Sequence, residues 1–431
     1  MAGMRTSITD LGTRVDSLDR MPSSRRRSWH GCVHLAGLVI WTSALSPTRI
    51  DPIKGLHIPE PYTYSPAAAV PEWQDAMRKE FEALKANRTW DIVPPSLAVP
   101  RSCSSSAPLV CKLLKSLCGL RQASRQWYAK LSQAPCSRGY SHSLNDYSLF
   151  TRGSGSSLVI LVVYVDDMIL TMTDLPEISS LKAFLHEQFK IKDLGSLNYF
   201  LGIEVLYSDS RVLLHQKKFV HELLDSFASS ASSAVIYPLA LNEKLKAYVG
   251  DPLPKPEEYR CLVGKLNFLI YIRPDISFAV QHLSQFLQAA LHLTRYLKGT
   301  SDFVLFFSNS SDLSLKVYWD SDWTSCVDSR RSVAGFCVFL GDYLVSWKSK
   351  KRHVVSLSSA EAEYMAMSKA ATKVTWLSRL MADFGISSSS PIPLYCDNEE
   401  ALHIARNPFF HEGTKHVELD CHFIRGKIGD G

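Results

Sequence analysis

The stretch Leu158-Val-Ile-Leu-Val-Val-Tyr164-Val-Asp166-Asp167-Met168-Ile-Leu170 predicts a strand, a tight acidic turn and a second strand. Apolar β-forming residues run up to two adjacent carboxylates, and apolar residues resume directly after them. Two neighbouring aspartates at the tip of a rigid hairpin can hold divalent metal ions where a phosphate is attacked. An Asp-Asp turn that only closes the hairpin is the simpler interpretation, and these residues taken alone favour it.

The composition is that of a globular protein with more than one domain. The chain has 431 residues, which is enough for two or three domains, and it is 46% hydrophobic and 21% charged. Its net charge of +6 permits a polyanionic partner without requiring one. The 10 cysteines include no Cys-x-x-Cys pair, which argues against structural zinc and secreted disulfide frameworks. A reducing compartment, cytoplasmic or nuclear, is therefore favoured over secretion.

Residues 1–59 differ from the rest of the chain. Three arginines, Arg25 to Arg27, precede a short apolar run over Cys32–Trp41. This run is shorter than the roughly 20 residues that a membrane-spanning helix needs, and His34 interrupts it. We predict an unassigned, disordered basic leader, with a targeting peptide as the alternative. No other stretch predicts a membrane span.

A mixed pattern of helices and strands follows. Pro71–Asn87 has the apolar spacing of an amphipathic helix, and a strand is predicted to begin near Trp90. Residues 96–108 are rich in Ser and Pro and predict a linker. Val110–Gln133 is predicted to be helical, and its cationic side chains interleaved with Trp127 suit a surface that faces phosphates and bases. A solvated amphipathic helix is the alternative.

Past the acidic hairpin, Ile178–Phe189 predicts a helix packed against the sheet, and Leu194–Val205 predicts a turn and a strand. A small sheet with helices behind it belongs to the α+β class.

Several separate motifs together resemble the reverse transcriptase of copia-type LTR retrotransposons. They are Pro71-Glu-Trp-Gln-Asp-Ala-Met, Asn87-Arg-Thr-Trp, Lys115-Ser-Leu-Cys-Gly-Leu-Arg-Gln-Ala-Ser-Arg-Gln-Trp-Tyr, Tyr164-Val-Asp-Asp, Leu194-Gly-Ser-Leu-Asn-Tyr-Phe-Leu-Gly-Ile-Glu, Tyr259-Arg-Cys-Leu-Val-Gly and Arg273-Pro-Asp-Ile-Ser-Phe-Ala. Matching segments extend in the family's order from about Glu60 to the last residue. The resemblance implies a palm in which Asp166 and Asp167 hold Mg²⁺ (or Mn²⁺) together with a third aspartate from the palm's first strand.

The same resemblance places a set of residues near the incoming nucleotide or the nucleic acid. Gly119, Arg121 and Gln122 would lie on the nucleotide side, and Arg125 and Trp127 belong to the cationic and aromatic surface described above. The implied partner is an RNA–DNA hybrid or another nucleic acid.

The chain also departs from the family. In copia-type enzymes a long stretch with the fingers and the first metal-binding aspartate separates the Asn-x-Thr-Trp strand from the Lys-Ser-Leu-x-Gly-Leu helix. Here only Pro94–Leu109 lies between them, without an aspartate. We therefore predict an inactive polymerase. A short Pro-containing turn is also missing near Gln288, which predicts a fused or misregistered helix pair.

The last third carries a second group of carboxylates. Leu315–Asp320 alternates like a strand, Val333–Phe339 and Tyr343–Trp347 form a hairpin, and a long helix runs from Ser358 to about Phe384. Leu394–Asp397 predicts a short strand that ends in an acid, followed by another helix. This order resembles the ribonuclease H fold, again in copia-type wording.

Hydrolysis of RNA in a hybrid needs carboxylates that hold divalent ions, and the resemblance favours Asp320, Glu363 and Asp397. Ser358-x-x-Glu361 has the spacing of a capping box, so Glu361 has a structural task at the helix start. Positions two apart on a helix differ by about 200°, and Glu361 therefore cannot share a site with Glu363. Asp322 is expected in the turn after the strand.

The predicted organisation is that of an internally deleted and C-terminally truncated Pol product. It comprises the leader 1–59, a partial reverse transcriptase over 60–245 with its fingers and first palm strand deleted near 95–109, thumb and connection helices over 246–311, and a truncated ribonuclease H-like domain over 312–431. The family's fourth acidic ligand is expected to be missing, and Glu418 or Asp420 could take its place.

The ancestral activities are RNA-directed DNA synthesis and hybrid cleavage, both magnesium-dependent. We expect the first to be lost and the second to be weak or lost. The alternatives are a non-catalytic nucleic-acid-binding remnant and a decayed product without a selected function.

Overall fold

The computed structural model describes residues 68–94, 110–115, 122–164, 167–172, 175–189, 191–208, 211–227, 233–239, 256–283, 288–308, 312–387, 390–406 and 418–429. The predicted leader and the predicted linker over 96–108 lie outside these residues. None of the helices in the described ranges is long and apolar enough to cross a membrane.

The first described unit is a helix with a two-stranded sheet. Helix α4 (Pro71–Ala86) confirms the amphipathic prediction, and β1 (Trp90–Val93) pairs antiparallel with β2 (Val110–Leu113). The helix predicted to start at Val110 is therefore wrong over its first turn. Pairing with β1 satisfies the backbone there, and this non-local gain overrides a weak helical pattern. The helix in this region, α5 (Ala123–Ser137), begins later.

The acidic hairpin is confirmed as two strands of one antiparallel sheet. The sheet has the order β3-β4-β5-β6, and its strands are β3 (Ser141–His142), β4 (Leu149–Arg152), β5 (Val159–Tyr164) and β6 (Asp167–Met172). Residues of β5 are buried on both faces, which explains the unbroken apolar run. One face packs with α5 and with α6 (Leu175–Phe189), which confirms the predicted helix over 178–189.

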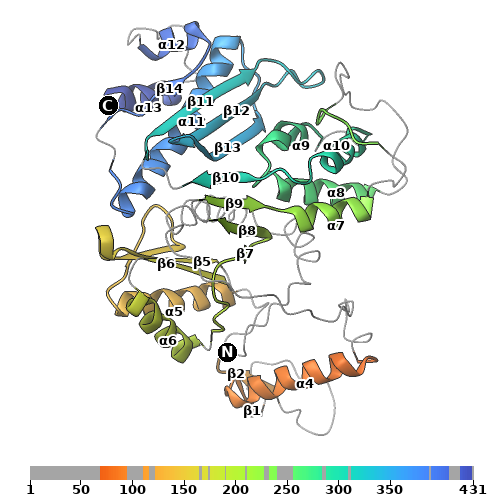
Figure 1. Cartoon of the computed structure of the whole chain (residues 1–431), viewed down its shortest axis with the longest axis vertical. Coiled ribbons are helices and arrows are strands. Elements are labelled where there is room, and N and C mark those ends of the chain that lie inside the picture. Colours follow the sequence, from red (N-terminus) through yellow and green to blue (C-terminus); the bar gives the residue numbers. More distant parts are fainter. Residues whose placement is uncertain are drawn as a thin grey trace.

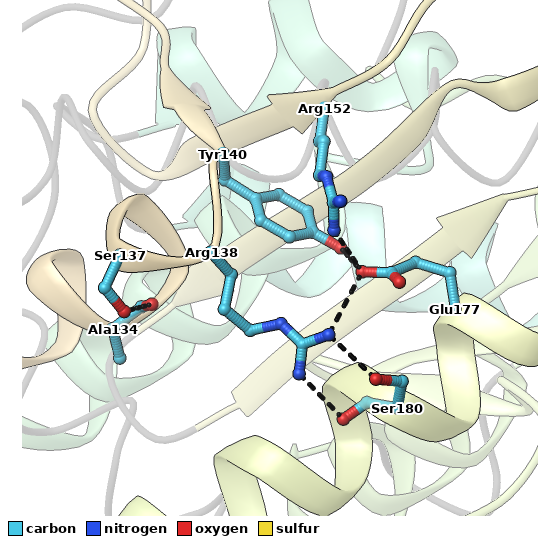
Figure 2. A network of polar contacts seen from close by, with 7 residues as sticks. All are labelled: Ala134, Ser137, Arg138, Tyr140, Arg152, Glu177 and Ser180. Carbon is cyan, nitrogen blue, oxygen red and sulfur yellow. Dashed lines mark hydrogen bonds and ion pairs between the residues drawn. The ribbon is translucent and has the colours of Figure 1, made fainter.

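A polar network joins the end of α5 to α6 across this sheet (Figure 2). The Glu177 carboxylate accepts hydrogen bonds from Arg152 at 2.7 Å and from the Tyr140 hydroxyl at 3.2 Å. Arg138 donates to the Ser180 hydroxyl at 2.7 Å and to its carbonyl at 3.2 Å. Burial, and then the Glu177 charge, raise the pKa of Tyr140 to about 12, so this phenol stays a donor. The network fixes α6 against the hairpin sheet.

A second antiparallel sheet joins distant parts of the chain. Its order is β10-β9-β8-β7, and its strands are β7 (Tyr199–Phe200), β8 (Ile203–Ser208), β9 (Arg211–His215) and β10 (Leu305–Ser308). Figure 1 shows this sheet between the hairpin sheet and the C-terminal sheet. The turn after β7 requires Gly202, because φ is +78° and a Cβ would lie 2.3 Å from the Phe268 ring.

Helices α7 (Lys217–Phe227), α8 (Pro256–Leu269), α9 (Ser277–Leu283) and α10 (Gln288–Gly299) pack beside this sheet. Helix α9 ends at Leu283 and α10 begins at Gln288, and residues 284–287, at the junction where a fused or misregistered pair was predicted, lie outside the described residues. Arg273 lies shortly before α9, is only 3% exposed and contacts the loop after α10. Its guanidinium donates to both carboxylate oxygens of Asp275 at 2.9 and 2.6 Å and to the Thr300 carbonyl at 2.8 Å.

The C-terminal sheet has the order β13-β12-β11-β14. Strands β11 (Leu315–Asp322), β12 (Val333–Leu340) and β13 (Tyr343–Lys351) are antiparallel neighbours, and β14 (Leu394–Tyr395) runs parallel to β11. The predicted hairpin and the predicted short strand are confirmed. Asp322 is the last residue of β11 and pairs with Val333, so its expected place in the turn is wrong.

Helix α11 (Ser359–Asp383) covers one face of this sheet, as predicted, and ends before Gly385, whose φ is +74°. Helices α12 (Glu399–Arg406) and α13 (Glu418–Gly429) pack against it. One apolar core runs from β5 through the middle sheet to α11.

Candidate functional site

The parallel pairing of β11 and β14 brings two aspartates to the same sheet edge. Tyr318 is the register partner of Tyr395, and Asp320 and Asp397 each follow two residues later. Because alternate residues of a strand point to the same face, Asp320 extends from the same side of the sheet as Tyr318, and Asp397 follows two residues after the end of β14. Both aspartates are exposed.

Glu363 reaches the same place from α11. It is 5% exposed, and its Oε1 accepts a hydrogen bond of 3.0 Å from the backbone N–H of Ser321. One carboxylate oxygen each from Asp320, Glu363 and Asp397 lies within 4.8 Å of the others. The carboxylates predicted from the sequence are therefore brought together.

Their closeness is electrostatically unfavourable. Burial raises the pKa of Glu363 to about 7, and the carboxylates of Asp320 and Asp397 act in the same direction. The N–H of Ser321 opposes this shift without cancelling it. Burial, and then the charge of Asp320, also raise the pKa of Asp322. Such a group of like charges can be neutralised by a cation between them.

The donor set fits a hard divalent cation. All ligands are carboxylate oxygens, which Mg²⁺ and Mn²⁺ prefer over softer metals. The second oxygen of Glu363 is buried without a hydrogen-bond partner among the described residues, as expected of an oxygen reserved for a ligand. No other group of three such ligands occurs in the described part of the chain.

The cap prediction for Glu361 is confirmed. The Ser358 hydroxyl accepts from the Glu361 N–H at 3.1 Å, and the Glu361 carboxylate accepts from the Leu357 N–H at 2.7 Å. Glu361 thus holds the start of α11, and this start places Glu363 one half-turn later against the end of β11.

The site of the acidic hairpin is less complete than the C-terminal group of three carboxylates. Asp166 lies outside the described residues. Asp167 is half-buried at the start of β6, where it pairs with Tyr164, and it belongs to no group of three metal-binding side chains in the described ranges. The structure does not bring it together with the C-terminal carboxylates. Glu418 and Asp420 fall in α13, but their side chains are outside the description.

The predicted nucleic-acid residues differ in their surroundings. Gly119 and Arg121 lie outside the described residues. Gln122 is the exposed N-cap of α5, and Arg125 is exposed on its first turn. Trp127 is half-buried and packs against the core of the hairpin sheet, so much of its ring serves packing.

Two tyrosines beside the carboxylates were not predicted from the sequence. The rings of Tyr318 and Tyr395 stack at 4.9 Å and are 47% and 46% exposed. The repeated spacing Tyr-x-Asp at Tyr318/Asp320 and Tyr395/Asp397 was the available signal.

Comparison with known proteins finds a reverse transcriptase family model and similar retrotransposon Pol polyproteins. A family model described as reverse transcriptase (RNA-dependent DNA polymerase) matches residues 99–240. The chain is 39% identical over 330 residues to the retrovirus-related Pol polyprotein from transposon RE1 of Arabidopsis thaliana, covering 75% of this chain and 22% of that protein. It is 33% identical over 342 residues to that from transposon TNT 1-94 of Nicotiana tabacum, covering 75% of this chain and 26% of that protein.

An uncharacterized mitochondrial protein of Arabidopsis thaliana is 36% identical over 227 residues, which cover 51% of this chain and 94% of that protein. The chain spans about a quarter or less of the length of the Pol polyproteins that it matches.

Proposed function

Because this chain belongs to the copia-type retrotransposon Pol family and includes a reverse transcriptase-like region, we propose that its C-terminal sheet cleaves the RNA strand of RNA–DNA hybrids. The observation that carries this proposal is the approach of Asp320, Glu363 and Asp397 to within 4.8 Å.

The arrangement of the sheet supports a ribonuclease H-like domain over 312–431. Three antiparallel strands are followed by a long helix and then by a strand parallel to the first. The carboxylates lie at the end of the first strand, at the start of the helix and directly after the parallel strand. This is the order that the ribonuclease H resemblance implies.

The three carboxylates differ in their exposure to solvent, and this difference suits them to different roles. Asp320 and Asp397 are exposed and can meet a phosphate from solvent, whereas Glu363 is buried and fixed by the Ser321 N–H. Together they would hold Mg²⁺ (or Mn²⁺), which when bound activates a water and stabilises the leaving oxygen of a phosphodiester. The rigid strand-to-helix hydrogen bond keeps Glu363 aligned without a substrate. Preorganised ligands of this kind need no rearrangement during the reaction.

The test is a cleavage assay on the full chain with a labelled RNA–DNA hybrid, in magnesium and in EDTA. We expect magnesium-dependent cleavage that Asp397→Asn reduces by at least about 100-fold, because each carboxylate stabilises developing charge. Asp342→Asn is the matched control, since Asp342 lies on the β12–β13 turn of the same sheet and is 89% exposed. Equal activity in both variants, or activity in EDTA, would contradict the proposal.

We further propose that residues 60–245 are a partial reverse transcriptase that does not extend primers. The short interval between Val93 and Val110 supports this, because it carries no aspartate to complete the site of Asp166 and Asp167. Primer–template with deoxynucleotides and magnesium tests the point directly, and any extension by the wild-type chain that Asp167→Asn abolishes would overturn it.

A further inference from the structure

The loop between β11 and β12 holds a cysteine next to a lysine from a different strand. Cys326 is 7% exposed, and the Nζ of Lys351, the last residue of β13, lies 2.7 Å from its Sγ. The two residues are 25 positions apart in the chain, so the contact depends on the fold and not on local sequence. A nitrogen this close can capture the sulfur when the sulfur is oxidised.

Backbone hydrogen bonds hold both residues in place. The Cys326 N–H donates to the Arg331 carbonyl at 3.2 Å, and the Arg330 N–H donates to the Cys326 carbonyl at 2.8 Å, so the loop closes on itself. Lys351 is fixed by its antiparallel pairing with Val333 of β12. The contact therefore joins two backbone segments that are each positioned independently of it.

The separation between nitrogen and sulfur is short for a hydrogen bond. N–H···O hydrogen bonds are about 2.9 Å long, and sulfur is a larger atom than oxygen, so an ordinary contact of an ammonium with sulfur is longer than this. A single oxygen atom bonded to both Lys351 Nζ and Cys326 Sγ spans 2.7 Å without movement of either residue. The geometry thus suits a bridge of the order N–O–S.

The surroundings of Cys326 favour its ionised form. Burial opposes ionisation of the thiol, but the Lys351 ammonium and the N–H and hydroxyl of Ser329 outweigh burial and lower the pKa of Cys326 to about 7. The thiolate is the form of cysteine that peroxides oxidise. Cys337, on β12 of the same sheet, has the opposite character, because burial raises its pKa.

A buried hydroxyl beside the sulfur has capacity for a further hydrogen bond. The Ser329 Oγ is shielded from solvent and meets no partner at hydrogen-bonding geometry within the described part of the chain. It lies near enough to Cys326 to affect the pKa of the thiol. An oxygen atom added to the sulfur would give this hydroxyl the acceptor that it lacks.

We propose that peroxides join Cys326 and Lys351 through a reversible N–O–S cross-link, independently of whether the chain cleaves RNA–DNA hybrids. In the first step the Cys326 thiolate attacks a peroxide oxygen. The S–O bond forms, the O–O bond breaks, and the leaving hydroxide takes a proton from the Lys351 ammonium. The products are a sulfenic acid, a neutral amine and water.

A second peroxide completes the bridge. The Lys351 amine attacks its oxygen, and the leaving hydroxide takes an amine proton, which gives a hydroxylamine and water. The hydroxylamine oxygen then displaces hydroxide from the sulfenic sulfur of Cys326, and this hydroxide leaves as water with the hydroxylamine O–H proton. Sulfur and nitrogen each lose two electrons, and each peroxide gains two.

The cross-link would fix the loop that follows the candidate site. Trp323 begins this loop directly after Asp322, and its indole N–H donates to the Ser356 carbonyl at 3.0 Å, just before α11. A covalent link between Cys326 and Lys351 restricts the unfolded chain in the way that a disulfide does. Oxidation should therefore raise the melting temperature by several degrees.

The experiment treats the full chain with hydrogen peroxide, alkylates free thiols with iodoacetamide in denaturant and maps the peptides by mass spectrometry. We expect a linked pair of peptides containing Cys326 and Lys351, heavier by about 14 Da than the reduced pair, because one oxygen is gained and two hydrogens are lost. Excess dithiothreitol should restore the original masses and the original melting temperature. Cys337 in the same sample should remain alkylatable.

Lys351→Arg keeps the positive charge but supplies no nucleophilic amine, so in this variant Cys326 should gain about 16 or about 32 Da as its sulfenic or sulfinic acid without a cross-link. Lys350→Arg is the matched control, because the neighbouring side chain lies on the other face of β13, and it should cross-link as the wild type does.

The wild-type masses decide the question whether or not Lys351→Arg folds. Uptake of oxygen by Cys326 without a link to Lys351 would overturn the proposal, and so would a Cys326 that stays reduced as long as Cys337 does. A linked pair lighter by about 2 Da would also overturn it, because that mass belongs to a direct S–N bond without the bridging oxygen.

Discussion

Trp376 on α11 donates its indole N–H to the backbone carbonyl of Asn145 at 2.9 Å, although 231 residues separate them in the chain. Further along the helix, the Asp383 carboxylate accepts hydrogen bonds from the Ser143 hydroxyl at 2.6 Å and from the Asn145 amide at 3.0 Å. The loop between β3 and β4 is thereby tied to the helix that carries Glu363. This contact sets the position of the acidic hairpin sheet relative to the C-terminal carboxylates.

Asp383→Ala is expected to destabilise the chain by about 1–3 kcal/mol, because the Ser143 hydroxyl, in a residue only 5% exposed, loses its acceptor. Urea unfolding followed by tryptophan fluorescence measures the change. Asp225→Ala, at an exposed position of α7, is the control and should shift the midpoint little. Equal midpoints for the two variants would show that the loop contact contributes nothing measurable.

Arg273→Lys should also destabilise strongly despite keeping the charge. A lysine cannot reproduce the forked hydrogen bonds to Asp275 and Thr300 from a site that is 3% exposed. We expect a loss of about 3 kcal/mol, in the range found when buried charge pairs are broken. Arg260→Lys, on the exposed side of α8, is the control for the same chemical change. Retained stability in Arg273→Lys would mean that the forked geometry is dispensable.

Ser358→Ala removes the hydroxyl that caps α11 and should lower the free energy of unfolding by about 1 kcal/mol. The Leu357–Glu361 hydrogen bond survives in this variant, so the helix start is weakened rather than lost. Thermal unfolding monitored by circular dichroism measures the effect. The neighbouring Ser359→Ala serves for comparison, and a larger loss there would contradict the cap assignment.

The lowered pKa of Lys373 predicts a dependence of stability on pH. Burial lowers its pKa to about 7 in the folded chain, whereas an unfolded lysine titrates near about 10.4. Between these values the unfolded chain binds the additional proton, so the free energy of unfolding rises with pH from about 7 to about 10. Below pH 7 both states carry the charge and this gain is absent.

Lys373→Met should remove that rise. The variant is expected to be more stable than the wild type near pH 7, and the difference should shrink toward pH 10, as measured by melting temperatures across this range. Lys85→Met, on the exposed side of α4, controls for loss of a lysine. A difference that grows with pH would contradict the assignment.

Local signals in the sequence were sufficient for the acidic hairpin and for α11. An apolar run interrupted by two acids defines β5 and β6, and Ser358 with Glu361 marks the helix start. Val110–Leu113 was predicted as helix because its strand character depends on pairing with Trp90–Val93, which lies before the Ser/Pro-rich interval. No periodicity within the segment records that partner.

In the candidate site, too, some features could be predicted from the sequence and others depend on the pairing of distant segments. The pattern and the family resemblance identified Asp320, Glu363 and Asp397, and the structure brings them together through the parallel pairing of β11 with β14. The stacked tyrosines Tyr318 and Tyr395 were not predicted, because their rings meet only after the register of β11 with β14 is known.

The pairing of β10 with β9 has a consequence for fragments of this chain. β9 ends at His215 and β10 begins at Leu305, so a cut anywhere between them leaves each fragment with one side of a shared strand pair. Exposed strand edges seek a partner, and the complementary edge lies on the other fragment. Two separately expressed pieces, divided between α7 and α8, should therefore reassemble as a non-covalent complex. The pairing of β9 with β10 in the middle sheet would hold the two fragments together.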